Sequence, residues 1–180
     1  MFCINRFHLI FCKSFDSFQD LLTNSTFVWI NAHFDHVGVK ARLESSKLLL
    51  DHVRKMKSST VKVILSGDFN CEESEEPYKL LTGEKYQKDK KSMGDSSEIF
   101  FSDTRYEVKG LKEGSFGFVK TWTGFSKDTP QEGIDYILID DNSISTQAVK
   151  VISHGVVPNL YDDGMYISDH RPIISDLLIN

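Results

Sequence analysis

The sequence predicts an α/β protein in which sheet and helix pack as layers around one core. Three observations predict this class. Runs of β-branched and aromatic residues at 26–33, 61–65 and 134–139 have the composition of buried strands. A helical pattern of apolar residues separates the first two runs. Strand, helix and strand in such close succession are typical of a βαβ-like unit.

Composition is consistent with one folded domain over residues 1–180. The hydrophobic content of 40%, with 11 glycines, falls in the range of globular proteins. The three cysteines, Cys3, Cys12 and Cys71, are odd in number and lack the spacing of a disulfide framework, so a reducing compartment is expected and the cytoplasm is favoured. The apolar start of the chain is interrupted by polar residues, and no membrane span is predicted.

The net charge of −5 argues against a broad basic face that would hold nucleic acid by releasing counterions. Net charge says little about a local cleft, however. A small phosphate ester and a nucleic acid both remain open as substrates, and the oligomeric state is not indicated.

The first predicted elements form a hairpin followed by a helix. Thr26 to His33 is a strand, with residues 8–12 as its expected partner and 23–25 as turn residues. After Gly38 the apolar period changes to 3.6, which predicts an amphipathic helix. Its buried face is expected to hold Ala41, Ser45, Leu48, Leu49, Val53 and Met56, and its other faces Arg42, Glu44, Lys47, Arg54 and Lys57.

The rest of the chain alternates strands with loops. Val61 to Leu65 is a short strand that ends near Gly67 and Asp68, and the acidic run 72–77 with Pro77 is typical of a helix start. The polar residues 87–97 are expected to form an exposed loop. Four further strands are predicted, at 116–123, 134–139, 147–153 and 171–179.

Two short motifs lie at strand ends, where open α/β folds present ligand-binding side chains. In Gly67-Asp68-Phe69-Asn70, Asp68 offers a hard oxygen for Mg²⁺ or for orienting water, and Asn70 can donate its amide to a phosphoryl oxygen. In Ser168-Asp169-His170-Arg171-Pro172, Asp169 is a possible metal ligand and His170 suits proton transfer. An ordinary polar turn is the alternative for each.

Asp135 lies among apolar neighbours, between Ile134 and Tyr136, where a charge is costly without a partner. A buried imidazole would be such a partner, since hydrolases use a carboxylate to hold a histidine in its active tautomer. A solvent-facing carboxylate on an edge strand is the alternative.

Two further segments have competing interpretations. The tail of Asn31-Ala32-His33-Phe34-Asp35-His36 resembles part of a zinc metallo-hydrolase motif, but Asn31 stands where that motif usually has a histidine. Trp122 and Phe125 are aromatics beside Gly124 that either line a substrate pocket or pack in the core.

Taken together and in this order, the motifs resemble the endonuclease/exonuclease/phosphatase family. The residues that carry the resemblance are Asn-Ala-His-Phe-Asp-His-Val-Gly at 31–38 with Ala41-Arg42, then Gly-Asp-Phe-Asn, Ile-Asp-Tyr and Ser-Asp-His-Arg-Pro. The resemblance covers Thr26 to Leu178. It implies a four-layer α/β sandwich, with two packed sheets between helices, and a hydrolase of phosphate esters that uses Mg²⁺ or Mn²⁺.

The resemblance also implies roles for single residues. By that similarity His33 contacts the scissile phosphate or protonates the leaving oxygen, Asp68 orients water or holds metal, and Asn70 positions the phosphoryl group. Asp169 resembles a metal ligand. His170, oriented by Asp135, would neutralise the phosphoryl group or transfer a proton.

One part of the family pattern has no match in the sequence. The family begins with a strand that bears an Asn, followed by a Gln-Glu element whose Glu binds metal, and neither is found here. Glu44 lies within the predicted helix and does not substitute by motif. The expected fold is therefore incomplete at the N-terminus, with sheet edges and apolar surface exposed. A catalytically silent phosphate-binding fragment is the alternative to a hydrolase.

Overall fold

A computed structural model of the chain describes residues 12–21, 24–56, 61–83, 99–108, 115–128 and 130–180. Eight strands and four helices lie in these ranges. The strands are β1 (Cys12–Gln19), β2 (Thr26–His33), β3 (Lys62–Asp68), β4 (Phe101–Asp103), β5 (Ser115–Gly117), β6 (Asp135–Asp140), β7 (Val149–Val156) and β8 (Ile173–Ile179). The helices are α1 (Val39–Met56), α2 (Glu76–Thr82), α3 (Thr104–Glu107) and α4 (Asp141–Ser145).

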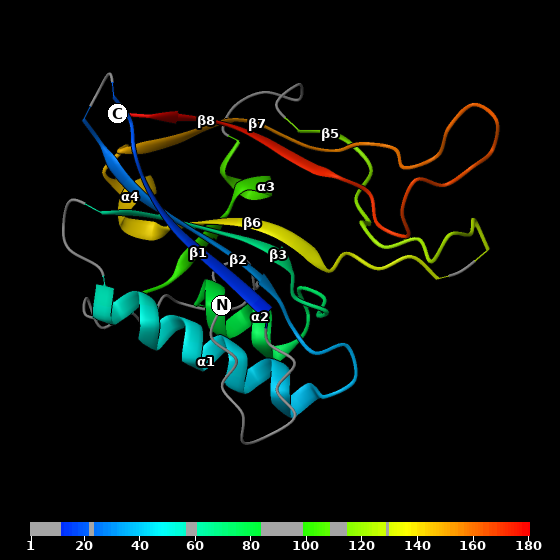
Figure 1. Ribbon diagram of the computed structural model, residues 1–180, viewed down its shortest axis with the longest axis horizontal. Helices are drawn as coiled ribbons and strands as arrows, with labels where there is room; N and C mark the ends of the chain where they lie inside the picture. Colours follow the sequence, from blue (N-terminus) through cyan, green and yellow to red (C-terminus); the bar gives the residue numbers. More distant parts are fainter. Residues whose placement is uncertain (1–11, 22–23, 57–60, 84–98, 109–114, 129) are drawn as a thin grey trace.

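The strands form two sheets, as the α/β sandwich requires. The five-stranded sheet has the order β1-β2-β3-β6-β4, and the three-stranded sheet has the order β5-β7-β8. Helices α1 and α2 cover one face of the larger sheet, and the smaller sheet lies on the side of its other face (Figure 1). The described residues thus supply three of the expected four layers, namely helices and two sheets.

The main core lies between the larger sheet and helices α1 and α2. Side chains from β2, β3 and β6 meet both helices there, with Ile30, Val53, Leu65 and Leu81 almost fully buried. A smaller core joins the two sheets around Ile139, and includes Val149 and Val151 of β7. The βαβ prediction is confirmed, because β2 and β3 pair in parallel across α1.

The amphipathic pattern of α1 is confirmed in part, since Ala41, Leu48 and Met56 are only partly buried and Ser46 and Leu50, which were not predicted, are buried. Ser45, Leu49 and Val53 are buried as predicted, but Arg42 is also buried, with 6% of its surface exposed. Its Nη2 atom lies 3.1 Å from Oε2 of Glu75, and Nη1 donates to the carbonyl of Asp35. The guanidinium is buried because it joins the start of α1 to the segment before α2.

Two predicted strands differ in the structure. The partner of β2 is β1, which begins at Cys12, and most of the predicted partner segment lies outside the described residues. The strand predicted over 116–123 ends at Gly117, since Gly117 has φ +81° and packs against the carbonyl of Val156. The chain then leaves the sheet, and the Thr121 amide donates to Glu132 instead.

The short elements β4, α3 and α4 escaped prediction because they span three to five residues each. Aspartates begin both helices: Asp103 accepts from the Arg105 amide and Asp140 from the Ser143 amide. The start of α2 at Glu76 and Pro77 is confirmed. The loop predicted over 87–97 lies outside the described residues. No described helix has the length and apolar character needed to cross a membrane.

Candidate active site

Neighbouring strand ends bring three polar side chains to one edge of the larger sheet. Asp68 ends β3, and in the parallel register it lies beside His33, which ends β2. In the antiparallel register it lies opposite Asp135, which begins β6. The end of one strand meets the start of its antiparallel neighbour, so two carboxylates distant in sequence face each other.

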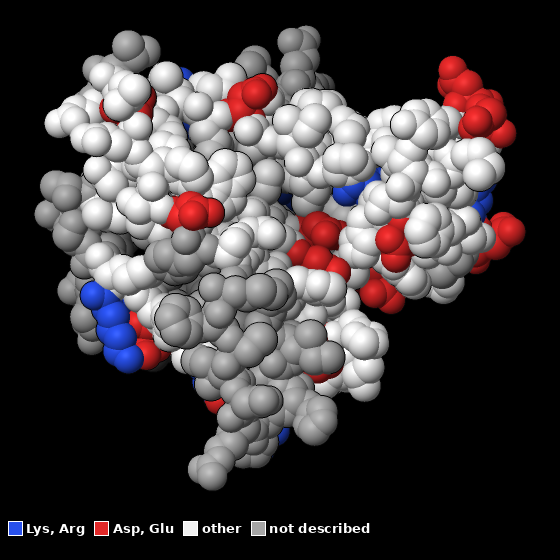
Figure 2. Space-filling view, in the orientation of Figure 1, with Lys and Arg blue, Asp and Glu red and all other residues white. Residues whose placement is uncertain are grey.

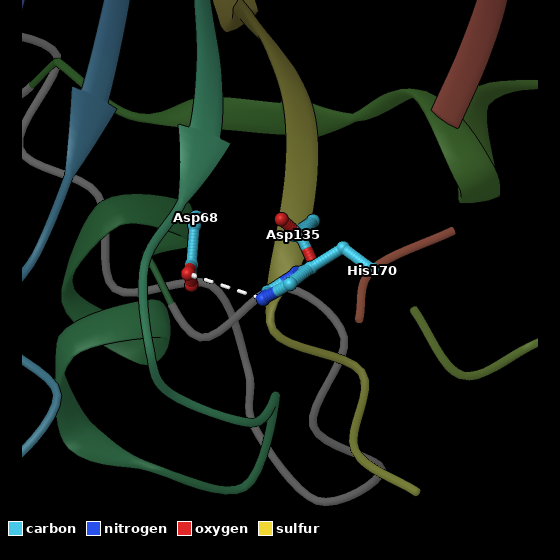
Figure 3. Close-up of side chains that lie close together, drawn as sticks. All are labelled: Asp68, Asp135 and His170. Carbon is cyan, nitrogen blue, oxygen red and sulfur yellow. Dashed lines mark hydrogen bonds and ion pairs between the residues drawn. The ribbon is translucent and has the colours of Figure 1, made fainter. Parts of the chain in front are cut away.

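His170 completes this group from the loop before β8. Its Nδ1 atom lies 2.8 Å from Oδ2 of Asp135, and its Nε2 atom lies 3.8 Å from Oδ2 of Asp68. Figure 3 shows the imidazole between the two carboxylates. Sequence reasoning paired Asp135 with His170, and the structure brings these two residues together.

The six residues predicted for the site line one open pocket of about 620 Å³. They are His33, Asp68, Asn70, Asp135, Asp169 and His170. His36, Trp122 and Glu132 also line the pocket. In the orientation of Figure 1, acidic side chains occupy a hollow near the right-hand ends of β3 and β6 (Figure 2).

Burial and mutual charge set the electrostatics of the pocket. Burial of Asp68, together with the negative charge of Asp135, raises the pKa of the Asp68 carboxyl above its ordinary value. The hydrogen bond that His170 donates to Asp135 raises the pKa of His170, so the imidazolium form is favoured. His33 is more open, with 61% of its side chain exposed and its Nε2 atom 3.3 Å from Oδ2 of Asp68.

The turn after β3 explains the Gly-Asp-Phe-Asn motif. Gly67 has φ +137°, and a Cβ atom there would lie 1.9 Å from the Ala32 carbonyl oxygen, so only glycine fits this close approach. Asp68 accepts from the Asn70 amide at 2.8 Å, and Asn70 has φ +48°. The side-chain Nδ2 of Asn70 donates to the carbonyl of Phe34, which fixes the amide at the pocket and leaves part of its hydrogen-bonding capacity free.

A row of aromatic rings supports this turn from below. Phe34 stacks on Phe69 with ring centroids 4.9 Å apart, and Phe69 stacks on Tyr136 at 5.6 Å. The Tyr136 hydroxyl donates towards the carbonyls of Cys71 and Gly133. The tyrosine of the Ile-Asp-Tyr motif therefore joins the chain before β6 to the chain after β3, beside Asp135 and Asp68.

Buried polar residues to which sequence reasoning gave no role complete the site. The Thr121 hydroxyl accepts from the backbone amides of Ile134 and Asp135, which fixes the start of β6. Thr123 and Asn159 are buried beside the segment that carries Asp169 and His170. Thr123 and Asn159 bond to each other although they are 36 positions apart in sequence, and neither residue type nor spacing indicates such a contact.

The competing interpretations of two segments are separated by the structure. Trp122 lines the pocket, whereas Phe125 is exposed and does not line it. Asp35 accepts from the amides of Gly38 and Val37, and these hydrogen bonds hold the pKa of Asp35 below its ordinary value. Its carboxylate is thus used in the turn that leads into α1. This role argues against Asp35 as a zinc ligand.

One group of side chains has the geometry of a metal site. Asp68, Asp135 and His170 each offer a ligand atom, and these atoms lie within 4.8 Å of one another. Among the described residues no second group of this kind occurs. Asp169, predicted as a metal ligand, lines the same pocket but lies outside this tight group.

Comparison with protein families gives one match over most of the chain. The model of the Endonuclease/Exonuclease/phosphatase family matches residues 6–170. No curated protein sequence matches the chain.

Solved structures share the fold at low sequence identity. An endonuclease/exonuclease/phosphatase from Bacteroides vulgatus is 23% identical with a TM-score of 0.71, and the match covers 93% of this chain and 55% of that one. The mannosyl-6-phosphatase of Bacteroides thetaiotaomicron is 22% identical with a TM-score of 0.71, over 93% and 57%. TDP2 of D. rerio, complexed with single-strand DNA product, is 15% identical with a TM-score of 0.62, over 94% and 62%. The chain thus spans little more than half the length of these proteins.

Proposed function

The chain belongs to the endonuclease/exonuclease/phosphatase family, and we propose from this membership and from the geometry of its pocket that it hydrolyses phosphate esters with a divalent cation. The convergence of Asp68, Asp135 and His170 is the observation that carries the proposal. Two carboxylates and an imidazole in one open pocket supply groups for holding a cation, orienting water and neutralising a phosphoryl group.

The residues of the pocket fit a hard divalent cation. Asp68 and Asp169 offer carboxylate oxygens, which Mg²⁺ and Mn²⁺ prefer, and these two residues would hold the ion. The raised pKa of Asp68 marks a carboxylate whose negative charge is poorly compensated, and a cation beside it would stabilise that charge. When bound, the ion polarises the phosphoryl oxygens as a Lewis acid.

Asp68 and Asn70 are placed to work on water and phosphate. The Asp68 carboxylate orients a water molecule for in-line attack on phosphorus, so that a new P–O bond forms as the bond to the leaving oxygen breaks. The Asn70 side chain, fixed by its bond to Phe34, directs its remaining amide hydrogen at a phosphoryl oxygen. His33, the most exposed of the three, contacts the phosphate or protonates the leaving oxygen.

His170 supplies positive charge at the phosphoryl group. Asp135 binds Nδ1, which leaves Nε2 pointing toward Asp68 and the pocket. The raised pKa extends upward the pH range in which the ring is protonated. An imidazolium in that position stabilises the charge that develops on the transferring phosphoryl group.

Phosphate binding without turnover is the alternative function. Asp68 and Asp169 alone would hold a hard cation loosely, since Mg²⁺ keeps most of its waters when only one or two carboxylates bind it. Weak hydrolysis is therefore expected from the chain as it stands. The substrate is a small phosphate ester or a nucleic acid, because the relatives of similar fold include both a sugar phosphatase and a protein solved with DNA.

The test is hydrolysis of p-nitrophenyl phosphate, a monoester, and bis(p-nitrophenyl) phosphate, a diester, by the purified chain in millimolar Mg²⁺. Calorimetry with inorganic phosphate runs in parallel. Release of nitrophenol that saturates with substrate supports the hydrolase. Phosphate binding without release of nitrophenol favours the silent alternative, and neither binding nor release rejects both.

A further inference from the structure

Asn159 is a polar side chain buried in the loop that precedes the pocket. Only 2% of its surface is exposed, although it lies in irregular chain between β7 and β8. Its Nδ2 atom donates to two acceptors, the Thr123 hydroxyl at 3.0 Å and the Ser168 carbonyl at 2.7 Å. A buried amide with both hydrogens used is costly to replace, because its partners would lose their donor.

Thr123 continues this network to the pocket segment. Its hydroxyl accepts from Asn159 and donates to the Asp169 carbonyl at 2.9 Å. The backbone amides of Thr123 and Gly124 donate to the same carbonyl. The carbonyls of Ser168 and Asp169 are therefore both anchored, the first by Asn159 and the second by the chain around Thr123.

Asn159 also joins the two ends of the loop 160–166. The Ile167 amide donates to the Asn159 carbonyl at 2.9 Å, so backbone and side chain of Asn159 both hold the returning chain. The intervening residues 161–165 are exposed. His170 lies just after Ile167 in the same returning segment. It forms an antiparallel β-bridge with Trp122, the residue before Thr123.

We propose that Asn159 is a positioning residue for the active site, which holds Asp169 and His170 in place through Thr123. The expected effect on turnover rests on the proposed function of the pocket. The hydrogen bonds that link Asn159 to Asp169 through Thr123 do not depend on that function. Asn159 is not among the residues that line the pocket. Its effect is exerted on the segment 168–170, which carries a carboxylate and an imidazole into the pocket.

Asn159→Asp is the sharpest test, because it keeps the shape and removes both donors. The aspartate oxygen would then face the Ser168 carbonyl and the Thr123 hydroxyl. Amide hydrogen exchange by NMR reports the result. Exchange at Thr123 and Gly124 should accelerate by about tenfold or more, while exchange in β3 stays unchanged. Thr123→Val removes the hydroxyl from the other side of the link and should act in the same direction, whereas Thr123→Ser keeps the hydroxyl and should preserve wild-type exchange.

Kinetics with bis(p-nitrophenyl) phosphate give the second readout. Asn159→Asp should lower kcat about 10–100-fold and change KM by less than about threefold, since a displaced group loses transition-state stabilisation more than substrate binding. Unchanged exchange at Thr123 and Gly124 would overturn the proposal. So would equal acceleration in β3, which would mean a general loss of stability.

If wild-type chain proves inactive, the proposed function fails and the exchange result alone decides the role of Asn159. If Asn159→Asp does not fold, the comparison of Thr123→Val with Thr123→Ser decides it. Equal exchange in these two variants would reject the link.

Discussion

The Nδ1 atom of His170 lies 2.8 Å from the Oδ2 atom of Asp135, although 35 residues separate the two in sequence. This hydrogen bond fixes the ring and leaves Nε2 directed into the pocket. It also raises the pKa of His170, because the carboxylate stabilises the protonated ring. Asp135 thus acts on the pocket through His170.

The first prediction concerns this pair. His170→Ala should reduce turnover by roughly 10²–10⁴-fold, the range for losing a positioned acid-base or electrostatic group. Asp135→Asn should do similar damage, because an amide no longer favours the charged, oriented imidazole. The two losses should be non-additive in the double mutant, since the pair acts as one unit. Circular dichroism checks folding, and losses that multiply independently would refute the pairing.

The fold was predictable where the pattern is local. The strand Thr26–His33, the helix after Gly38 and the strand that ends at Asp68 follow from apolar period and composition, and all three are confirmed. Arg42 was assigned to the exposed side because a charged residue normally faces solvent. Its burial depends on Glu75, which is distant in sequence, so no local pattern reports it.

The site was predictable in its motif residues only. Motif order and family resemblance named the six residues that share the pocket. Thr121, Thr123 and Asn159 were missed, because each is an ordinary polar residue whose importance comes from a distant partner. The strand predicted over 116–123 was too long because apolar residues after Gly117 suggested a continuing strand. The backbone amides of Thr121 and Trp122 donate to the Glu132 carbonyl, outside the sheet.

The second prediction concerns the buried ion pair of Arg42 and Glu75. Glu75→Gln keeps the shape of the side chain but leaves the Arg42 guanidinium buried without its counter-charge. The free energy of unfolding should fall by about 1–2 kcal/mol, moderated because Glu75 is partly exposed. Urea denaturation measures it. Glu44→Gln is the matched control, since Glu44 pairs with Lys47 on the surface, and should cost less than about 0.5 kcal/mol. Equal losses of unfolding free energy in the two variants would show that the buried pair adds no more stability than the surface pair.

The third prediction concerns His154, which is buried between the sheets. Its Nδ1 atom bonds the hydroxyls of Thr104 and Ser175, and its Nε2 atom has no hydrogen-bond partner in the described part of the chain. Burial lowers the pKa of His154 to about 4, so the neutral ring is favoured in the folded state. Between pH 6.5 and 4, His154 is protonated in more of the unfolded chains than of the folded ones. The contribution of His154 to stability is therefore lost as the pH falls through that window.

His154→Leu should therefore remove part of the acid sensitivity. Relative to wild type, the variant should lose roughly 3 kcal/mol less unfolding free energy between pH 7 and pH 4. Asp103, whose pKa burial raises to about 6, acts in the opposite direction but is present in both proteins. Urea denaturation at the two pH values measures the difference. A variant with wild-type pH dependence would show that His154 does not titrate as described.

The fourth prediction concerns exposed apolar side chains on the two sheets. Phe18 and Trp29 lie half-exposed on the larger sheet, and Ile174 and Leu178 lie half-exposed on β8. Apolar surface of this kind favours association with another chain. Sedimentation should detect self-association that rises with concentration, and Leu178→Lys should weaken it. Tyr161→Ser, on an exposed loop, is the control. Wild-type chain that stays monomeric at high concentration would contradict the prediction.

The central claim is that the pocket around Asp68 hydrolyses phosphate esters with a hard divalent cation. Its most direct test is the Mg²⁺ dependence of bis(p-nitrophenyl) phosphate hydrolysis by wild type and Asp68→Asn. Asp162→Asn, which changes an exposed carboxylate outside the pocket, is the control. Wild type and Asp162→Asn should show weak activity that EDTA abolishes and that Mg²⁺ or Mn²⁺ restores. Asp68→Asn should lose about 10²-fold or more. Activity that resists the chelator, or that Asp68→Asn retains in full, would contradict the account.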